Sequence, residues 1–206
     1  DCQWDMTAYD QLLSARTRIV ALAHITNVTA TRQPIETVIT KAHQHNAVVV
    51  VDGAQGIVHE SVDVTQLDAD FYVFSGHKLY APAGIGALYG TTEALDRARP
   101  YQGGGEMIEI VTRDRVTYNT APHKFEAGTP PILEAIGLGA ALDWMTAFDH
   151  ADVVAHETAL YRRAHDGLRG VNGLTIHGDT PDKGAVLAFS LQGAHPHDLA
   201  QILDRY

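Results

Sequence analysis

The sequence predicts an α/β protein built on a mostly parallel β-sheet flanked by helices. Short runs of apolar and β-branched residues alternate with segments of helical spacing in the first part of the chain, as in βαβ units. One of these runs, Val48–Asp52, opens with four consecutive valines. Such a run is typical of a strand that is buried on both faces of a parallel sheet. With 206 residues and 45 % apolar side chains, the chain is long enough and apolar enough to bury a substantial core.

The first elements follow one another at short intervals. Residues 7–17 have helical spacing, and Ile19–Ala23 is predicted to be a short buried strand. Pro34 is a favourable first residue for the next helix, and Asn46 is a plausible end. One face of this helix carries the apolar residues Ile35, Val38, Ile39 and Ala42.

Two further strands are predicted in the first half. After Val48–Asp52, a connection through Val62–Val64 leads to a strand over residues 70–74. Residues 84–90 form the next strand, and the three glycines at 103–105 mark a loop.

The second half begins with helices. A long apolar helix starts after Pro130 and Pro131 and reaches Met145, and a second helix over residues 151–168 ends at Gly170. Strands are predicted over residues 174–177 and 186–191, and they are followed by a helix near the end of the chain. We place a domain boundary near residues 146–149, so that 1–147 are part of one larger domain and 148–206 are part of a smaller α/β domain.

Composition limits the class of partner. The 25 acidic and 15 basic side chains give a net charge of -10, which argues against a nucleic acid or an anionic membrane as the main partner. The only cysteine, Cys2, cannot form an internal disulfide, and no apolar stretch is long enough to span a bilayer. We therefore expect a cytoplasmic protein that binds a small ligand or another protein.

Polar side chains stand at the ends of the predicted strands. Asn27 follows the first strand, Asp52 closes the valine-rich strand, and Ser75, Gly76, His77 and Lys78 follow the next strand. In open α/β sheets, ligands bind beyond the carboxyl ends of the strands. We therefore expect these groups to face one crevice.

A lysine and an aspartate in one crevice suggest pyridoxal phosphate. This cofactor needs an amine that forms a Schiff base, and a carboxylate that keeps its pyridine nitrogen protonated. Lys78 and Asp52 are the candidates. The phosphate needs hydroxyl and N–H donors, which Ser75, His77 and the Gly76 backbone would supply.

Each of these motifs also has a simpler interpretation. The Ser75–Lys78 segment can be an exposed loop, and Asp52 can be an ordinary turn residue before Gly53. Asn27 and Gln55 can each cap a backbone group. Two pairs of histidines could suggest a metal site: His43 and His45, and His195 and His197. Packing or solvated histidines are the simpler interpretation, because no carboxylate or cysteine at ligand spacing lies near either pair in the sequence.

Four segments in order along the chain strongly resemble the SUF-type cysteine desulfurases: Val51–Gln55, Asp70–Tyr80, Tyr101–Ile108 and Lys124–Pro130. These enzymes belong to the class V aminotransferase group of fold-type I pyridoxal phosphate enzymes. The resemblance extends over nearly all of the chain. It implies a mostly parallel sheet flanked by helices as part of the large domain, and the start of a smaller C-terminal domain.

The resemblance also implies roles for individual residues. Lys78 would hold the cofactor as a Schiff base and remove the α-proton of the substrate. Asp52 would pair with the pyridine nitrogen, and Gln55 would donate a hydrogen bond to the phenolic oxygen. Ser75 and His77 would hold the phosphate.

Further roles involve the substrate and a second subunit. Asn27 would lie near the phenolic oxygen and the substrate carboxylate. Thr129 would reach the phosphate of the partner subunit, since members of the family are homodimers with shared active sites.

The reaction implied is conversion of L-cysteine to L-alanine, with transfer of the sulfur as an enzyme persulfide to an acceptor protein for iron-sulfur cluster assembly. The family's nucleophilic cysteine and carboxylate-binding arginine would follow Tyr206, so we expect the chain as given not to turn over cysteine by itself. Other class V enzymes remain alternatives, namely a selenocysteine lyase, an epimerase or a kynureninase-like hydrolase. A non-catalytic scaffold is the alternative from a different class.

Overall fold

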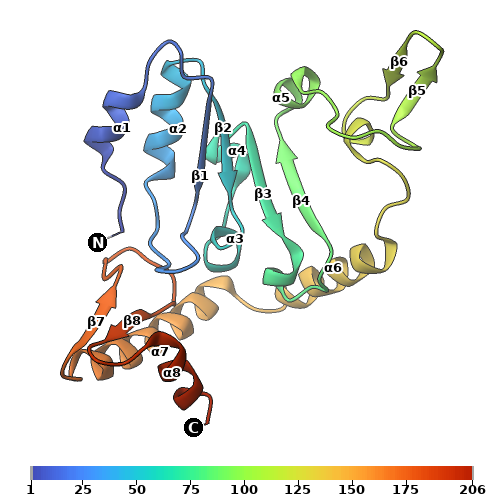
Figure 1. The fold of residues 1–206 in the computed structure, drawn as a ribbon. Coiled ribbons are helices and arrows are strands. Elements are labelled where there is room, and N and C mark those ends of the chain that lie inside the picture. The colour runs from blue at the N-terminus through green and yellow to red at the C-terminus, as the bar shows by residue number, and fades with distance from the viewer. Residues whose placement is uncertain (1, 206) are drawn as a thin grey trace.

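The structure is a computed structural model that describes residues 2–205. Its centre is a four-stranded sheet in the order β1-β2-β3-β4 (Figure 1). The strands are β1 (Ile19–Ala23), β2 (Val48–Asp52), β3 (Phe71–Ser75) and β4 (Gly86–Gly90). The first three strands are parallel, and β4 is antiparallel to β3. The predicted α/β architecture with a mostly parallel sheet is therefore confirmed.

The direction of β4 departs from the strand-helix-strand pattern. The connection between β3 and β4 is a single turn of 3-10 helix, η1 (Gly76–Leu79), and a short loop. A parallel crossover needs a dozen or more residues, whereas a short connection suits an antiparallel neighbour. The chain consequently reverses directly after β3, and the residues of η1 lie at the edge where β2 and β3 end.

Two helices pack on one face of the sheet: α1 (Met6–Leu12) and α2 (Ile35–Gln44). The four residues predicted to share the apolar face of α2 are its buried residues. They pack against Val49 and Val51 of β2, which are fully buried. Helix α1 is shorter than predicted, because the Ser14 N–H turns to the Thr17 hydroxyl at 3.0 Å instead of continuing the helix.

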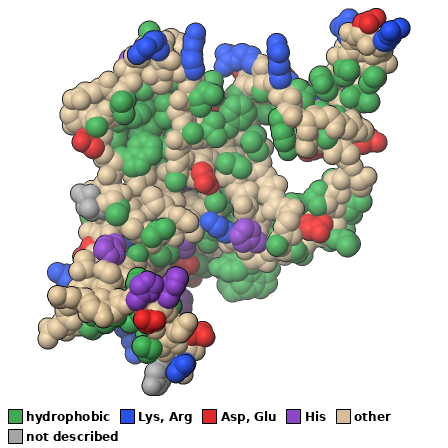
Figure 2. Space-filling model, in the orientation of Figure 1, with side chains coloured by type: hydrophobic (Ala, Val, Ile, Leu, Met, Phe, Trp, Pro, Cys, Tyr) green, Lys and Arg blue, Asp and Glu red, His purple; other side chains and the backbone are tan. Residues whose placement is uncertain are grey.

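The second face of the sheet is only partly covered by the described residues. Val48 and Val50 are half-buried and Asp52 is exposed, in alternation with the buried valines. Leu88 of β4 is 56 % exposed. Figure 2 shows hydrophobic side chains gathered over the sheet. The expectation that β2 is buried on both faces is therefore met on one face only within residues 2–205.

Several short elements were not predicted: α3 (Gly56–His59), α4 (Val64–Leu67), α5 (Thr92–Arg97), η2 (His123–Phe125), and a hairpin of β5 (Ile108–Val111) and β6 (Val116–Tyr118). Helices α3 and α4 stand where a simple connection was expected. Asp63 caps α4, accepting hydrogen bonds from the N–H groups of Thr65 and Gln66 at 2.9 and 3.1 Å. The hairpin extends away from the sheet (Figure 1).

The second half of the chain follows the predicted order of elements: α6 (Ile132–Met145), α7 (His150–Arg169), β7 (Leu174–His177), β8 (Ala188–Leu191) and α8 (Pro196–Leu203). Strands β7 and β8 form a separate antiparallel sheet. The division into domains 1–147 and 148–206 stays a prediction. Among the helices of residues 2–205, we find none with both the length and the hydrophobicity needed to cross a bilayer.

The C-terminal segment returns to the main sheet through backbone contacts. The Gly184 N–H donates to the Ala30 carbonyl at 2.8 Å, and the Arg32 N–H donates to the Asp182 carbonyl at 3.2 Å. Between them, Thr31 and Lys183 form an isolated antiparallel bridge. Residues 178–185 therefore lie beside the loop that follows β1.

Candidate active site at the carboxyl edge of the sheet

The structure brings Asp52 and Ser75 to the same face and the same edge of the sheet. Asp52 is in register with Val73 of β3, and Ser75 lies two residues further along that strand. Because side chains alternate between faces, Asp52, Val73 and Ser75 point to one side. Tyr72 points to the other side, where it is buried with the core. Figure 2 shows acidic, basic and histidine side chains close together below the hydrophobic area of this face.

Lys78 lies in η1, directly after β3, and its side chain is half-buried. Neither a hydrogen bond nor an ion pair joins its ammonium group to any residue in the part of the chain that the structure describes. Helix α3, which follows Asp52, lies beside η1 (Figure 1). The amine is therefore available at the edge that also carries Asp52.

The other residues of this segment differ in what they can still bind. The Ser75 hydroxyl does not cap η1, and the His77 side chain is exposed. The Gly76 N–H, by contrast, donates to the Ile85 carbonyl at 2.8 Å. The prediction that the Gly76 backbone donates to a phosphate is therefore wrong, because the β3–β4 connection already uses that group.

Asp52 is a turn residue, and it also keeps an oxygen with which it could bind a ligand. Its Oδ1 atom accepts a hydrogen bond from the Ala54 N–H at 2.9 Å, as in an ordinary turn. No hydrogen bond from residues 2–205 reaches its second carboxylate oxygen. One oxygen therefore holds the turn, and the other is free to accept a proton donor.

Gln55 and Asn27 do not cap the backbone. Gln55 is the N-cap residue directly before α3, but its side chain makes no capping hydrogen bond. Asn27 is exposed in the turn after β1. Within the described residues neither side chain has a hydrogen-bond partner. The capping interpretation is thus not supported for either residue, and their roles stay predictions.

Thr129 lies apart from this group. It is exposed, and it follows Gly128, whose φ is 80°. The hydrogen bonds of the described residues do not connect Thr129 to Asp52 or to Lys78. Its predicted role concerns a partner subunit and stays a prediction.

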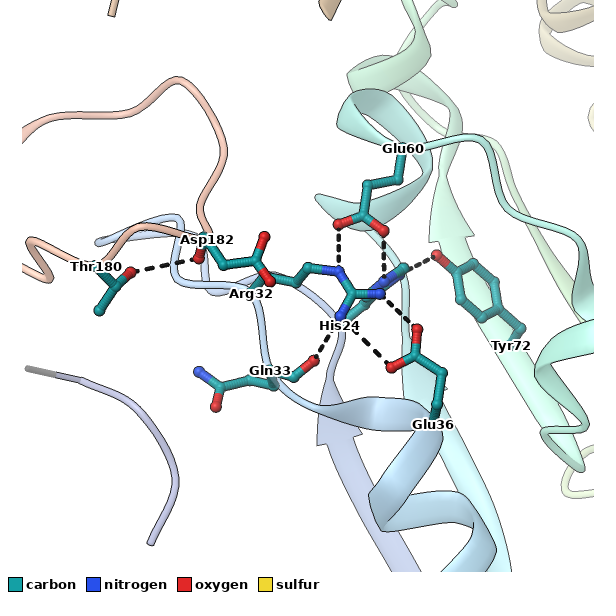
Figure 3. A network of polar contacts seen from close by, with 8 residues as sticks. All are labelled: His24, Arg32, Gln33, Glu36, Glu60, Tyr72, Thr180 and Asp182. Carbon is teal, nitrogen blue, oxygen red and sulfur yellow. Dashed lines mark hydrogen bonds and ion pairs between the residues drawn. The ribbon is translucent and has the colours of Figure 1, made fainter. Parts of the chain in front are cut away.

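A buried polar network that sequence reasoning missed lies beneath the turn after β2 (Figure 3). His24, only 3 % exposed, contacts the Tyr72 hydroxyl through Nδ1 at 3.1 Å. Its Nε2 atom lies 3.2 Å from Oε2 of Glu60. The other Glu60 oxygen accepts from Nε of Arg32 at 2.8 Å, and Arg32 also pairs with Glu36.

The network shifts the pKa values of its members. Burial raises the pKa of Glu60, but the hydrogen bond and charge of His24, together with those of Arg32, more than offset burial and leave the pKa below its ordinary value of 4.5. Burial first, and then the charges of Glu60 and Asp52, raise the pKa of Tyr72. The Tyr72 hydroxyl therefore stays protonated at neutral pH.

The histidine pairs have other partners than a metal. His43 contacts Asp70 through Nε2 at 3.0 Å and Asp68 through Nδ1 at 3.6 Å, two carboxylates that lie far from it in the sequence. His195 accepts from the His197 N–H at 3.2 Å, at the start of α8. Residues 2–205 contain no group of three or more potential metal-ligating side chains.

Residues 1–206 match the sequence model of one protein family, aminotransferase class-V. The chain belongs to the aminotransferase class-V family. A probable cysteine desulfurase of Vibrio cholerae is 54 % identical over 203 residues, which are 98 % of this chain and 50 % of that protein. A cysteine desulfurase of Enterobacter sp. is 46 % identical over 198 residues, which are 96 % of this chain and 48 % of that protein.

Two solved structures that are similar to this class V chain are also structures of cysteine desulfurases. The cysteine desulfurase CsdA of Escherichia coli matches with a TM-score of 0.93 and 42 % identity, over 98 % of this chain and 50 % of that one. A cysteine desulfurase of Thermococcus onnurineus matches with a TM-score of 0.91 and 33 % identity, over 99 % of this chain and 51 % of that one. These matches confirm the predicted fold and the predicted family. The chain spans about half the length of the curated relatives that it matches.

Proposed function

We propose that this chain is part of a pyridoxal phosphate-dependent cysteine desulfurase, which converts L-cysteine to L-alanine and passes the sulfur to an acceptor protein for iron-sulfur cluster assembly. The observation that carries the proposal is the free amine of Lys78 at the sheet edge where Asp52 keeps one carboxylate oxygen unused. The likeness of nearly the whole chain to proteins named cysteine desulfurase supports it.

The groups at this edge fit the cofactor in kind. Lys78 supplies an amine without a competing partner among residues 2–205. Asp52 supplies a carboxylate, and Ser75 and His77 supply a hydroxyl and an imidazole for the phosphate. Gln55 is free to donate an amide N–H to the phenolic oxygen, and Asn27 is proposed to lie near that oxygen and the substrate carboxylate.

The residues of this chain would then bind and move protons. When bound, the cofactor supplies an electron sink for the carbanion that forms at the substrate's α-carbon. Lys78 would hold the cofactor covalently until the amino group of the substrate displaces it, and its freed amine would then remove and return the proton at that carbon. Asp52 keeps a proton on the ring nitrogen, and each pKa unit of such stabilisation corresponds to about 1.4 kcal/mol.

Several parts of the reaction lie outside these residues. The only cysteine, Cys2, is exposed and belongs to none of the motifs that define the edge site. The sulfur-accepting cysteine and the arginine for the substrate carboxylate are therefore proposed to come from the other half of the protein. A homodimer, in which Thr129 reaches the partner's phosphate, is part of the proposal, as is a cytoplasmic location.

The test uses the full gene product that contains this chain. We expect added pyridoxal phosphate to give a yellow protein, and borohydride to fix the cofactor on the peptide that carries Lys78. Lys78→Ala should abolish this fixation. The matched control is Lys41→Ala. Lys41, on α2, is ion-paired with Asp10 of α1 at 2.6 Å, and its replacement should leave fixation unchanged.

Asp52→Asn is the second arm of this test. An asparagine keeps the oxygen that accepts from Ala54 but loses the charge, so we expect the fold to survive while alanine formation from cysteine falls on the order of 100-fold. Asp63→Asn, at the cap of α4, is the control that should leave activity unchanged. A protein that stays colourless with added cofactor would contradict the enzyme and favour a scaffold. Fixation at Lys78 without alanine formation from cysteine would favour another class V reaction.

A further inference from the structure

We propose that His24 is a positioning residue for the turn between β2 and α3, residues 52–56, and that through this turn it sets the places of Asp52 and Gln55. The inference rests on the proposed function, in which these two side chains bind the cofactor. His24 touches neither side chain's free polar atoms; it supports the backbone from below.

The first support is a backbone link on each side of the turn. The His24 N–H donates to the Asp52 carbonyl at 2.9 Å, and the Gly53 N–H donates to the Val73 carbonyl at 2.8 Å. The beginning of the turn is thus held by β1 on one side and by β3 on the other. On the β1 side, His24 extends the ladder by one residue beyond Ala23, the register partner of Asp52.

The second support is contact between the turn and two buried side chains. A β-carbon at Gly53 would lie 2.0 Å from the ring of Tyr72, and one at Gly56 would lie 2.2 Å from Nδ1 of His24. These distances are far below van der Waals contact, so the backbone rests directly on the two side chains. Glycine is required at both positions for the turn to come this close.

The third support is the polar network, which fixes the imidazole itself. His24 lies between the Tyr72 hydroxyl at 3.1 Å and Oε2 of Glu60 at 3.2 Å. Glu60 is the residue that directly follows α3, and Arg32 holds its other oxygen. One buried histidine therefore lies against Gly56, the first residue of α3, and beside Glu60, the residue after its last. Figure 3 shows the second of these contacts.

The consequence for the site is geometric. Binding constellations must be held within roughly 0.5 Å of their productive geometry by supporting residues. Gln55 is the N-cap residue directly before α3, and Asp52 closes β2 at the other end of the same turn, so a rotation or shift of this short helix would move Gln55 directly and Asp52 through the turn. A four-residue helix has too few internal hydrogen bonds to hold its own orientation.

The experiment uses the full gene product and measures pyridoxal phosphate itself as the ligand. We expect His24→Gln to weaken cofactor binding by about 10-fold or more, as loss of an outer-shell support does at other sites. The visible circular dichroism of the bound cofactor should also change, because it reports the orientation of the ring relative to the protein. Fixation at Lys78 by borohydride should persist at saturating cofactor.

Two controls separate positioning from stability. His43→Gln removes a comparable histidine-carboxylate contact, to Asp70, at the opposite end of β3. Val38→Ala destabilises the core of α2 without touching the turn. Both should lower the melting temperature while cofactor affinity stays within about 2-fold and the circular dichroism of the cofactor is unchanged.

Tyr72→Phe keeps the inference testable if His24→Gln does not fold. It retains the ring beneath Gly53 and removes only the hydroxyl that contacts His24, so we expect a smaller change in the same two readouts. Unchanged cofactor dichroism in His24→Gln and Tyr72→Phe, or the same loss of affinity in the controls, would overturn the inference. A wild-type protein that binds no cofactor would overturn the proposed function and this inference together, whereas wild-type binding with indifferent His24 variants overturns this inference alone.

Discussion

At the scale of single residues, Glu60 connects His24 and Arg32 beneath the candidate site. It lies 3.2 Å from His24 and 2.8 Å from Arg32, and its side chain is 28 % exposed. Because both neighbours favour the ionised carboxylate, they lower the pKa of Glu60 despite its burial. The charge of Glu60 is therefore coupled to the stability of the fold.

A pH series on Glu60→Gln tests this coupling. A carboxyl whose pKa is lower in the folded state adds stability that is fully present above its unfolded pKa, near 4.5, and is lost as the pH falls through the lower folded pKa. We expect the variant to be less stable by about 2 kcal/mol at pH 7, since the replacement leaves buried partners with weaker hydrogen bonds. The difference from the wild type should shrink below pH 4.5.

Urea unfolding between pH 7 and pH 3, followed by far-UV circular dichroism, measures this difference. Glu93→Gln is the control, because its pair with Arg97 is exposed and salt bridges of that kind add little. A difference between wild type and Glu60→Gln that is constant over the whole series would contradict the coupling.

Some residues of the candidate site can be placed from the sequence and others cannot. Lys78, Asp52 and Ser75 could be placed at one edge because each closes or follows a strand with a clear pattern, and parallel neighbouring strands end at the same edge. His24 and the occupied N–H of Gly76 could not be foreseen. His24 meets Tyr72, which is 48 positions away, and Gly76 donates to Ile85 only because β4 turns out to be antiparallel.

At the scale of elements, the length of a helix or strand decides how well its pattern of apolar residues predicts it. The predicted bounds of β1 are correct to the residue. The apolar spacing in α2 predicts its buried face correctly, and the two prolines before α6 predict where that helix begins. Helices α3 and α4 have four residues each, which is barely one turn, so no periodicity can mark them. The missed element α3 is the one that begins directly after Gln55.

Two glycine substitutions test the close approach of α3 to its neighbours. Gly56→Ala places a β-carbon 2.2 Å from the His24 ring, so we expect it to cost about 2 kcal/mol of unfolding free energy or more. Gly139→Ala is the matched control, since Gly139 lies within α6 and nothing stands within 4 Å of its added β-carbon. Alanine should there be neutral or stabilising by about 0.5–1 kcal/mol, because it favours the helix.

Chemical denaturation of the two variants beside the wild type gives both values. If Gly56→Ala is as stable as Gly139→Ala, the turn between β2 and α3 does not rest on His24 as described, and the support for the positioning role is lost.

At the scale of the whole molecule, Arg32 contacts both the C-terminal segment, residues 178–185, and the polar network below the candidate site. Arg32 donates its backbone N–H to Asp182, while its side chain holds Glu60 below the site. His59, at the end of α3, also contacts Glu157 of α7 at 3.0 Å. The way in which residues 178–185 dock is therefore linked to α3 and, through it, to the turn that carries Asp52 and Gln55.

Gly178 lies very close to the loop after β1 in this docking. It has a φ of 65°, and a β-carbon added to it would lie 2.4 Å from Thr29. Gly193 has a similar φ of 79° but no atom within 4 Å of its added β-carbon. Alanine at either position carries the left-handed backbone cost of about 1–2 kcal/mol, and only Gly178→Ala adds the steric conflict with Thr29.

We therefore expect Gly178→Ala, and not Gly193→Ala, to loosen the contact between the C-terminal segment and the loop after β1. Hydrogen exchange measures this directly, because the N–H groups of Gly184 and Arg32 are donors across the contact. Their exchange should accelerate by at least about 10-fold in Gly178→Ala, which corresponds to about 1.4 kcal/mol of lost protection against local opening. The amides of β2 should keep their wild-type rates, since the core between β2 and α2 does not involve residue 178. Equal acceleration in Gly193→Ala would mean that backbone strain anywhere in this segment loosens the docking, and the specific fit of Gly178 against Thr29 would then be irrelevant to it.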